Sequence, residues 1–231
     1  MDQHGNRALI FLGGEAVPRN RFESLLSGSL LIAADSGAAW LTETNLRPQV
    51  LLGDFDSLDP ALRTKLEPQV EAYLPFPTDK DKTDGELAVD FALSRNLGEI
   101  VLIGGLGGRV DHAFGNAVLL FKIARKKRCG WMLNASSRIF PVPRRLQLDG
   151  VPGQMFSLLA LSPVKGLTIK GATYPMQGGS LILGQTLALS NRFLHSTVQL
   201  EKEKGLLLAI LLDNTEAVSY THLTLPTIYS V

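Results

Sequence analysis

The chain has 231 residues, of which 45% are hydrophobic and 19% are charged, a composition typical of a globular protein with one large domain or two small ones. Its formal net charge of +1 excludes a strong overall field for nucleic acid or for an anionic membrane surface. The single cysteine, Cys129, excludes an internal disulfide and a cysteine-based zinc site, and we expect a buried, unreactive thiol. The N-terminus is polar, and the longest apolar run, residues 206–212, is too short to span a bilayer. We therefore expect a cytoplasmic protein with no nucleic-acid partner and no membrane partner.

Short apolar runs alternate with helical patterns in the first part of the chain. Strands are predicted at residues 7–13, 30–34, 50–52, 70–74 and 99–104. Helices are predicted at residues 21–26, 38–44, 60–66, 84–96 and 112–127. Because these strands are almost continuously apolar, the alternation predicts an α/β domain over residues 1–143, with a mostly parallel sheet flanked by helices.

The pattern changes near residues 141–145, after which there is no good helix. Strand-like runs at 155–161, 167–170, 180–183, 197–201 and 205–212 are separated by Gly, Pro and Asn, which predicts a small antiparallel β-sandwich domain over residues 144–213. Glu203, Lys204 and Gly205 are expected to form a hairpin turn between the last two strands. Residues 214–231 carry no charge after Glu216, and we expect a peripheral segment or one that does not belong to the natural protein.

Three groups of acids follow predicted strands or lie in a loop that can reach the strand ends. Asp54 and Asp56 follow the third strand, Asp81 and Asp84 end a loop, and Asp111 follows the fifth strand. In open parallel sheets the ligand crevice lies beyond the carboxyl ends of the strands. Clustered carboxylates repel each other unless a cation is present, and Mg²⁺ typically takes one or two of them together with water and phosphate oxygens. The pattern predicts a Mg–nucleotide site, although Asp54 and Asp56 can converge only if the backbone turns between them.

Several of these acids also fit a purely structural role. Asp59 precedes a proline and is expected to cap the next helix, so no chemistry is assigned to it. Thr83 fits a capping box, in which Asp84 is a first-turn acid. Asp35 is an alternative cap for the second helix, and His112 fits a core or capping histidine equally well.

A glycine-rich turn, residues 104–108, follows the fifth strand and precedes a helix. Glycines there let the backbone approach a phosphate, and Arg109 adds a guanidinium that can pair with it. The turn lacks the Lys-Ser/Thr ending of a P-loop and does not have the spacing of the dinucleotide fingerprint, so alone it is a weak signal.

Together these stretches resemble the thiamin pyrophosphokinase family. The matching motifs are ADSGA (34–38), LLGDFDSLD (51–59), KDKTDGELA (80–88), GGLGGRVDHAFGN (104–116) and LSN (189–191), in the family's order and spacing. The combination is specific, whereas no single stretch is. One departure is Ser36, where the family usually has glycine. The resemblance implies an α/β catalytic domain followed by a β-sandwich, and a homodimer in which the partner's β domain completes each site.

The resemblance also implies roles at matching positions. The metal-binding acids would be Asp54, Asp56, Asp81 and Asp84, which with Asp111 would form the catalytic set. The nucleotide contacts would be Asp35, Thr83, Gly107, Gly108, Arg109 and Asn116. The thiamin contacts would be Asp111, His112, Ser190 and Asn191. The aromatic that stacks on thiamin is not assigned, and its candidates, for each of which core packing is also expected, are Trp40, Trp131, Phe193 and Tyr174.

The implied reaction is the Mg²⁺-dependent transfer of a pyrophosphoryl group from ATP to the hydroxyl of thiamin, giving thiamin diphosphate and AMP. Asp84 or Asp111 would accept the hydroxyl proton. Three alternatives stay open: transfer to another alcohol such as a hydroxymethylpterin, a phosphatase with Asp54 as nucleophile, and a non-catalytic nucleotide sensor.

Overall fold

A computed structural model of the chain describes residues 5–213, so the predicted tail at 214–231 lies outside the described residues. The chain divides into two compact units, one ending at Ala135 and the other beginning at Ser136. This division falls earlier than the boundary after residue 143 predicted from the sequence. The reason is that strand β7 (Ser137–Pro141) pairs with the last strand, β14 (Leu207–Leu212), and so belongs to the second unit.

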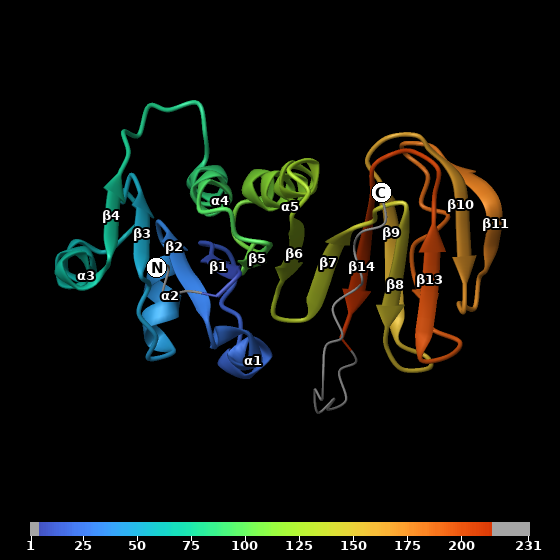
Figure 1. The fold of residues 1–231 in the computed structure, drawn as a ribbon, viewed down its shortest axis with the longest axis horizontal. Helices are drawn as coiled ribbons and strands as arrows, with labels where there is room; N and C mark the ends of the chain where they lie inside the picture. Colours follow the sequence, from blue (N-terminus) through green and yellow to red (C-terminus); the bar gives the residue numbers. More distant parts are fainter. Residues whose placement is uncertain (1–4, 214–231) are drawn as a thin grey trace. The chain divides into compact units, whose positions relative to one another are not determined.

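The first unit is built on a six-stranded parallel sheet in the order β6-β5-β1-β2-β3-β4 (Figure 1). Its strands are β1 (Arg7–Phe11), β2 (Ser29–Ala34), β3 (Val50–Gly53), β4 (Ala72–Pro75), β5 (Glu99–Ile103) and β6 (Cys129–Leu133). Every residue of β2, β3 and β5 is buried, as expected for a sheet covered by helices on both faces.

Helices cover both faces of this sheet. The chain runs from β1 outward to β4 and then returns to β5 and β6 on the other side of β1. Right-handed crossovers therefore place α1 (Glu23–Leu26), α2 (Gly37–Glu43) and α3 (Pro60–Leu66) on one face and α4 (Asp84–Ser94) and α5 (Val110–Arg125) on the other (Figure 1). Two short 3-10 turns, Arg19–Arg21 and Glu67–Gln69, flank α1 and α3. Among the described residues, no helix combines the length and the apolar character needed to cross a membrane.

Aromatic side chains fill the core beneath α2. Phe11 packs edge-to-face against both Phe22 and Trp40, with ring centroids 5.5 Å and 5.3 Å away. The indole N–H of Trp40 donates to the carbonyl of Leu12 at 2.8 Å, so its one polar atom is satisfied inside the core. Cys129 is half-buried, where the sequence predicted a buried thiol, and burial raises the pKa of this thiol to about 12, which keeps it protonated near neutral pH.

The second unit consists of antiparallel strands in two layers. One layer has the order β12-β9-β14-β7 and the other the order β11-β10-β13-β8. The strands not yet bounded are β8 (Arg145–Asp149), β9 (Met155–Ala160), β10 (Val164–Lys170), β11 (Met176–Leu181), β12 (Asn191–Arg192) and β13 (Thr197–Glu201). Alternate apolar side chains from both layers form one core. The predicted fold class, a parallel α/β sheet followed by an antiparallel β domain, is confirmed.

Several details of the second unit differ from the sequence prediction: β12 was missed, β11 begins and ends earlier than predicted, and two further differences have a clear physical reason. The hairpin predicted at residues 203–205 is wrong, because β13 pairs with β8 and β10 whereas β14 pairs with β7 and β9. The segment therefore crosses from one layer to the other. Strand β8 was missed, although Leu146 and Leu148 are buried and alternate with exposed polar residues, which is the period-2 signal of a half-buried strand.

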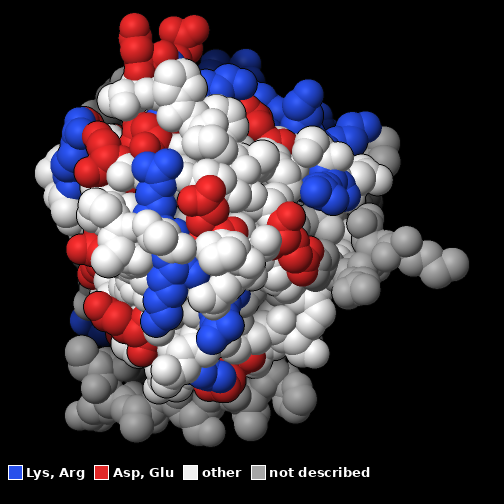
Figure 2. Space-filling model, turned by 90° about the vertical axis from the view of Figure 1, so that its left-hand side faces the viewer, with Lys and Arg blue, Asp and Glu red and all other residues white. Residues whose placement is uncertain are grey.

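Basic and acidic side chains are interspersed over the face shown in Figure 2, which carries no broad area of one sign. This agrees with the net charge of +1. A binding site for an anionic ligand would therefore depend on local groups rather than on a general field.

Candidate metal–nucleotide site

Three carboxylates meet at the carboxyl ends of neighbouring strands in the first unit. Asp35 follows β2, Asp54 follows β3, and Asp84 is the first residue of α4, which packs against both strands. Each offers one oxygen, and these oxygens all lie within 4.8 Å of one another. Because β2 and β3 pair in parallel, their ends fall at the same edge of the sheet and bring Asp35 beside Asp54.

The backbone at this edge is tightly packed. Gly53 has a φ of 144°, and a Cβ added there would lie 3.1 Å from the Cβ of Asp35. Asp35 itself has a φ of 46°, and its N–H donates to the carbonyl of Leu52 at 2.8 Å. The absence of a side chain at Gly53 thus allows the two acid-bearing strand ends to approach closely.

Lys80 lies within the acid cluster formed by Asp35, Asp54 and Asp84. Its Nζ donates to Asp54 Oδ2 at 2.8 Å and lies 3.0 Å from Asp84 Oδ1. The hydrogen bond from Lys80 holds the pKa of Asp54 below its usual range, against the opposing effect of burial. Burial raises the pKa of Asp84, and Lys80 offsets only part of that effect. Burial alone would lower the pKa of Lys80, but its contacts with Asp54 and Asp84 outweigh burial and raise it.

The acid cluster fits a hard divalent cation. Asp35 is only 9% exposed, and its Oδ1 has no hydrogen-bond partner among the described residues. Asp84 Oδ1 is likewise buried without a well-aligned hydrogen bond, despite the nearby Lys80. Buried carboxylate oxygens without partners are costly unless a cation binds them. An all-oxygen donor set is the one that Mg²⁺ prefers.

Two of the predicted metal acids, Asp56 and Asp81, lie outside the acid cluster. Both are exposed, and Asp56 accepts a hydrogen bond from Ser57 Oγ at 2.8 Å. The backbone does turn between Asp54 and Asp56, since Phe55 has a φ of 61°, and Asp56 N donates to Asp54 Oδ1 at 3.3 Å. The Asp56 side chain does not join the acid cluster, although a hydrogen bond with it helps to lower the pKa of Asp54.

Aromatic stacking stabilises this turn. Phe55 is 5% exposed and stacks on Tyr73 with ring centroids 5.1 Å apart. Arg63 lies over both rings and donates from Nε to the hydroxyl of Tyr73 at 2.7 Å. These contacts offset the strain of a left-handed backbone at a bulky residue and fix the direction of Asp54.

Two of the three predicted helix caps are confirmed and one is wrong. Asp59 caps α3 by accepting from the N–H groups of Ala61 and Leu62, as predicted. Thr83 caps α4 by accepting from Glu86 N at 3.2 Å, also as predicted. Asp35 does not cap α2, because the N-cap position falls on Ser36 and has no side-chain cap bond. Its carboxylate is therefore directed to the acid cluster.

The glycine-rich turn lies at the point where the strand order reverses, between β1 and β5. Gly14 N donates to Gly104 O at 3.0 Å, which joins the turns that follow these two strands. Asn116 on α5 donates to Gly105 O at 3.0 Å and fixes the turn to its helix. Gly107 and Gly108 both have positive φ, and within residues 5–213 their N–H groups have no partner. Free N–H groups at a switch point are suited to a phosphate.

Arg109 and Asp111 at the start of α5 form an exposed ion pair. Arg109 Nη2 lies 2.6 Å from Asp111 Oδ2, and the side chains are 72% and 64% exposed. The guanidinium lowers the pKa of Asp111 to about 2, so this carboxylate is a weak proton acceptor near neutral pH. His112 is also exposed.

The two candidates from the second unit, Ser190 and Asn191, have different environments. Asn191 is 2% exposed, and its side chain accepts from Tyr174 N at 3.0 Å and donates to Tyr174 O at 2.8 Å. It therefore holds the backbone of Tyr174. Ser190 is exposed with a φ of 57°, and its N–H donates to Ser157 Oγ at 3.0 Å.

Of the four aromatic candidates, only Tyr174 is exposed. Trp40 and Phe193 are 8% and 2% exposed, and both belong to cores. Trp131 is 4% exposed and donates from its indole nitrogen to Glu99. Tyr174 is 67% exposed, so its ring is accessible to a ligand.

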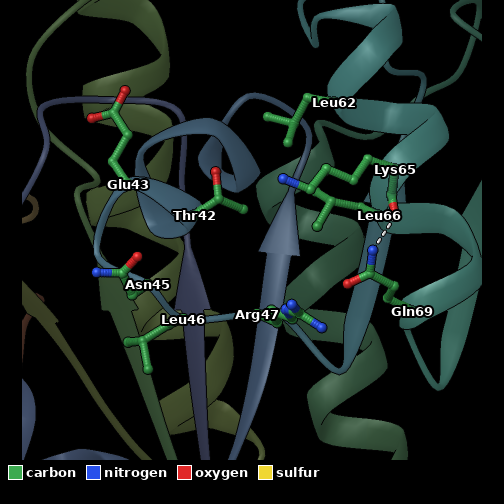
Figure 3. A pocket seen from close by; sticks show the side chains of 9 residues that line it. All are labelled: Thr42, Glu43, Asn45, Leu46, Arg47, Leu62, Lys65, Leu66 and Gln69. Atoms are coloured by element: carbon green, nitrogen blue, oxygen red, sulfur yellow. Dashed lines mark hydrogen bonds between the residues drawn. The ribbon is translucent and has the colours of Figure 1, made fainter.

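A hollow of about 480 Å³ lies away from these residues, between the end of α2 and α3 (Figure 3). It combines apolar side chains with charges of both signs, including Glu43, Arg47 and Lys65. None of its lining residues belongs to the predicted site. The acids and the glycine-rich turn lie at the carboxyl ends of the strands, whereas this hollow includes the loop that leads into the amino end of β3.

The fold and the site together define a class. A doubly wound α/β unit with clustered acids and a glycine-rich turn at its strand ends is the arrangement of proteins that bind metal–nucleotide complexes. The comparisons are more specific: residues 22–133 match the thiamin pyrophosphokinase catalytic domain, and residues 140–207 match the thiamin pyrophosphokinase vitamin B1 binding domain. The chain belongs to the thiamin pyrophosphokinase family, as its motifs predicted.

Individual relatives agree. The chain is 31% identical over 186 residues to thiamine pyrophosphokinase of Bacillus subtilis, covering 79% of this chain and 86% of the relative. It is 27% identical over 223 residues to thiamin pyrophosphokinase 1 of Caenorhabditis elegans, covering 89% of each. The solved thiamin pyrophosphokinase of Geobacillus thermodenitrificans is 29% identical with a TM-score of 0.79, covering 92% of this chain and 100% of that chain.

Proposed function

We propose that this protein transfers a pyrophosphoryl group from Mg-ATP to the hydroxyl of thiamin, giving thiamin diphosphate and AMP. The observation that carries the proposal is the acid cluster at the strand ends of a chain that belongs to this family. In the reaction the thiamin hydroxyl gives its proton to Asp84 or Asp111 and its oxygen bonds to the β-phosphorus. The bond from that phosphorus to the α-phosphate oxygen breaks, and AMP leaves. ATP is the common intracellular phosphoryl donor, which supports a cytoplasmic location.

Asp35, Asp54 and Asp84 would hold Mg²⁺, which when bound would neutralise charge on the phosphate oxygens. Asp35 enters this set although the sequence placed it among the nucleotide contacts. Asp56 and Asp81 are exposed, and each lies two or three residues along the chain from an acid of the cluster. We retain both as acids that would contact the metal–nucleotide complex through a water molecule or a second metal ion.

The phosphate chain would bind at the glycine-rich turn. The unpartnered N–H groups of Gly107 and Gly108 would donate to phosphate oxygens, and Arg109 would pair with them by exchanging Asp111 for phosphate. Asn116 acts indirectly, because its amide holds the turn. Since charge in phosphoryl transfer gathers on non-bridging oxygens, most of the catalytic effect would come from this positioning and electrostatic stabilisation.

Thiamin would bind on the second unit beside Tyr174. The exposed phenol ring can stack on an aromatic heterocycle or lie against the positively charged thiazolium. Asn191 supports Tyr174 through the backbone, and Ser190, the residue before Asn191, is exposed. Asp111 and His112 in the first unit remain proposed thiamin contacts.

We also propose a homodimer. Val110, Phe114 and Val118 are spaced by four residues on α5 and are 69%, 67% and 54% exposed, which forms an apolar stripe. Apolar side chains of the second unit are also exposed, namely Ile182, Leu183, Leu187 and Leu194. Monomeric proteins seldom expose such groups of large apolar side chains, and a second copy would cover them.

Incubation with Mg-ATP and thiamin tests the activity. We expect AMP and thiamin diphosphate in equal amounts by chromatography, with both products abolished by a chelator. Asp54→Asn and Asp84→Asn should each lower turnover by at least about a hundredfold, since they remove charge that holds the metal, while circular dichroism stays unchanged.

The alternatives give different products. AMP without thiamin diphosphate would favour another acceptor, and a hydroxymethylpterin would be assayed next. Release of inorganic phosphate with trapping of a phosphate mimic on Asp54 would favour the phosphatase. Nucleotide binding without any AMP would favour the sensor.

A further inference from the structure

Lys80 forms ion pairs with two carboxylates of the acid cluster at once. Its Nζ lies 2.8 Å from one carboxylate of the acid cluster and 3.0 Å from another, and its side chain is only 13% exposed. Both oxygens of Asp54 are engaged, Oδ2 by Lys80 and Oδ1 by the N–H of Asp56. The ammonium group therefore lies where a cation is needed, against the oxygens that a metal ion would take.

Lys80 lies outside the helices and strands of the first unit. It belongs to the irregular stretch between β4, which ends at Pro75, and α4, which begins at Asp84. Its neighbours Asp79, Asp81 and Lys82 are exposed, whereas Lys80 turns inward. A lysine side chain carries its charge on a flexible four-carbon stem and can leave a site without unfolding its surroundings.

We propose that Lys80 is a built-in counter-cation, which neutralises the acid cluster when no metal is bound and is displaced when a divalent metal ion binds. This inference rests on the proposed metal site. A metal ion about 2 Å from these oxygens and an ammonium less than about 3 Å from them would repel each other strongly, so the two cations compete. Once displaced, the ammonium is free to pair with the phosphates of the nucleotide.

Binding of the metal and of the nucleotide are consequently coupled. A metal ion that binds alone has to separate Lys80 from two carboxylates, which weakens its affinity. When nucleotide is present, phosphate oxygens give the lysine a new partner, and the metal binds more tightly. Coupling of this kind is reciprocal, so the metal also tightens nucleotide binding.

The test measures Mn²⁺ affinity by electron paramagnetic resonance on the full chain without nucleotide. Lys80→Met should bind Mn²⁺ about tenfold more tightly than the unaltered protein, because the competitor is gone. Its thermal midpoint without metal should fall, and Mn²⁺ should raise that midpoint by more than it does in the unaltered protein. Lys82→Met is the matched control, since Lys82 pairs with Asp90 outside the acid cluster, and it should leave Mn²⁺ affinity unchanged. Lys80→Gln, which keeps a hydrogen-bond donor without the charge, serves if the methionine variant fails to fold.

The outcomes separate this inference from the proposed function. If Asp54→Asn abolishes Mn²⁺ binding while both Lys80 variants bind as weakly as the unaltered protein or more weakly, the metal site stands and the counter-cation is refuted. If neither the unaltered protein nor the Lys80 variants bind Mn²⁺, the metal assignment falls and the counter-cation falls with it.

Discussion

Asn191 and Tyr174 show how one buried residue prepares another for contact with a ligand. Both ends of the Asn191 amide bond to the backbone of Tyr174, so this asparagine holds the tyrosine backbone in place. Such paired bonds in a buried position fix the local backbone firmly. The tyrosine ring is thereby presented on a rigid support while remaining 67% exposed.

At the scale of this residue we expect Tyr174→Ala to raise the KM for thiamin about tenfold, because stacking and cation–π contacts with the ring are lost. The KM for ATP should stay unchanged, and Tyr174→Phe should behave like the unaltered protein because it keeps the ring. Steady-state kinetics with each substrate varied in turn checks this. Equal KM values for thiamin in the alanine and phenylalanine variants would show that the ring does not contact thiamin.

The first turns of helices α3 and α4 hold the loops that carry the site acids. Helix α3 starts directly after the turn that carries Asp54 and Asp56, and its first N–H groups are satisfied by the carboxylate of Asp59. Helix α4 starts at Asp84 itself, with Thr83 as its cap. A capped helix start is well ordered, so both caps fix the loops in which the site acids lie.

We expect Asp59→Ala to lower the free energy of unfolding by about 1 kcal/mol, since two helix N–H groups lose their acceptor. Urea unfolding followed by circular dichroism measures this loss. Asp59→Asn keeps a cap acceptor and should lose much less. A loss in the asparagine variant as large as in the alanine variant would mean that the charge near the helix N-terminus, rather than the hydrogen bonds, stabilises α3.

The candidate site residues are divided between the two compact units of the chain. The acid cluster and the glycine-rich turn belong to the first unit, whereas Tyr174 and Ser190 belong to the second. The apolar stripe on α5 and the exposed apolar side chains of the second unit are the surfaces that a second copy would cover. In the proposed homodimer, each site draws its acids from one chain and Tyr174 and Ser190 from the other.

Mixing two impaired variants tests this sharing when thiamin is well below its KM, because under that condition each variant alone has lost most of its activity. Asp54→Asn removes one carboxylate of the acid cluster in the first unit, and Tyr174→Ala removes the exposed ring in the second unit. A mixed dimer would therefore retain one intact site. After co-refolding in equal amounts we expect about a quarter of the unaltered activity, since half of the dimers are mixed and each has one working site. Light scattering confirms the dimer. Activity no higher than the mean of the two variants would place both halves of the site on one chain.

Some residues could not be assigned from the sequence because their roles depend on neighbours that are far away in the chain. Lys80 was in a quoted motif but received no role, because its contacts with Asp54 and Asp84 depend on how the loop before α4 folds back on the strand ends. Asp35 was given a capping alternative that the structure contradicts. Tyr174 could not be distinguished from Trp40, Trp131 and Phe193, because an aromatic residue looks the same in sequence whether it is buried or exposed.

The sequence by itself determined the buried strands, most of the helices, the caps at Asp59 and Thr83 and the family, because these depend on local apolar periodicity, local hydrogen bonds and ordered motifs. Only the tertiary structure decided which acids meet. Asp35 joins Asp54 because β2 and β3 are neighbours in the sheet, and Asp84 joins them because α4 packs on both strands. The same reason explains the wrong hairpin: adjacency in the chain does not determine which sheet a strand enters, since burial of its apolar face against distant strands decides that.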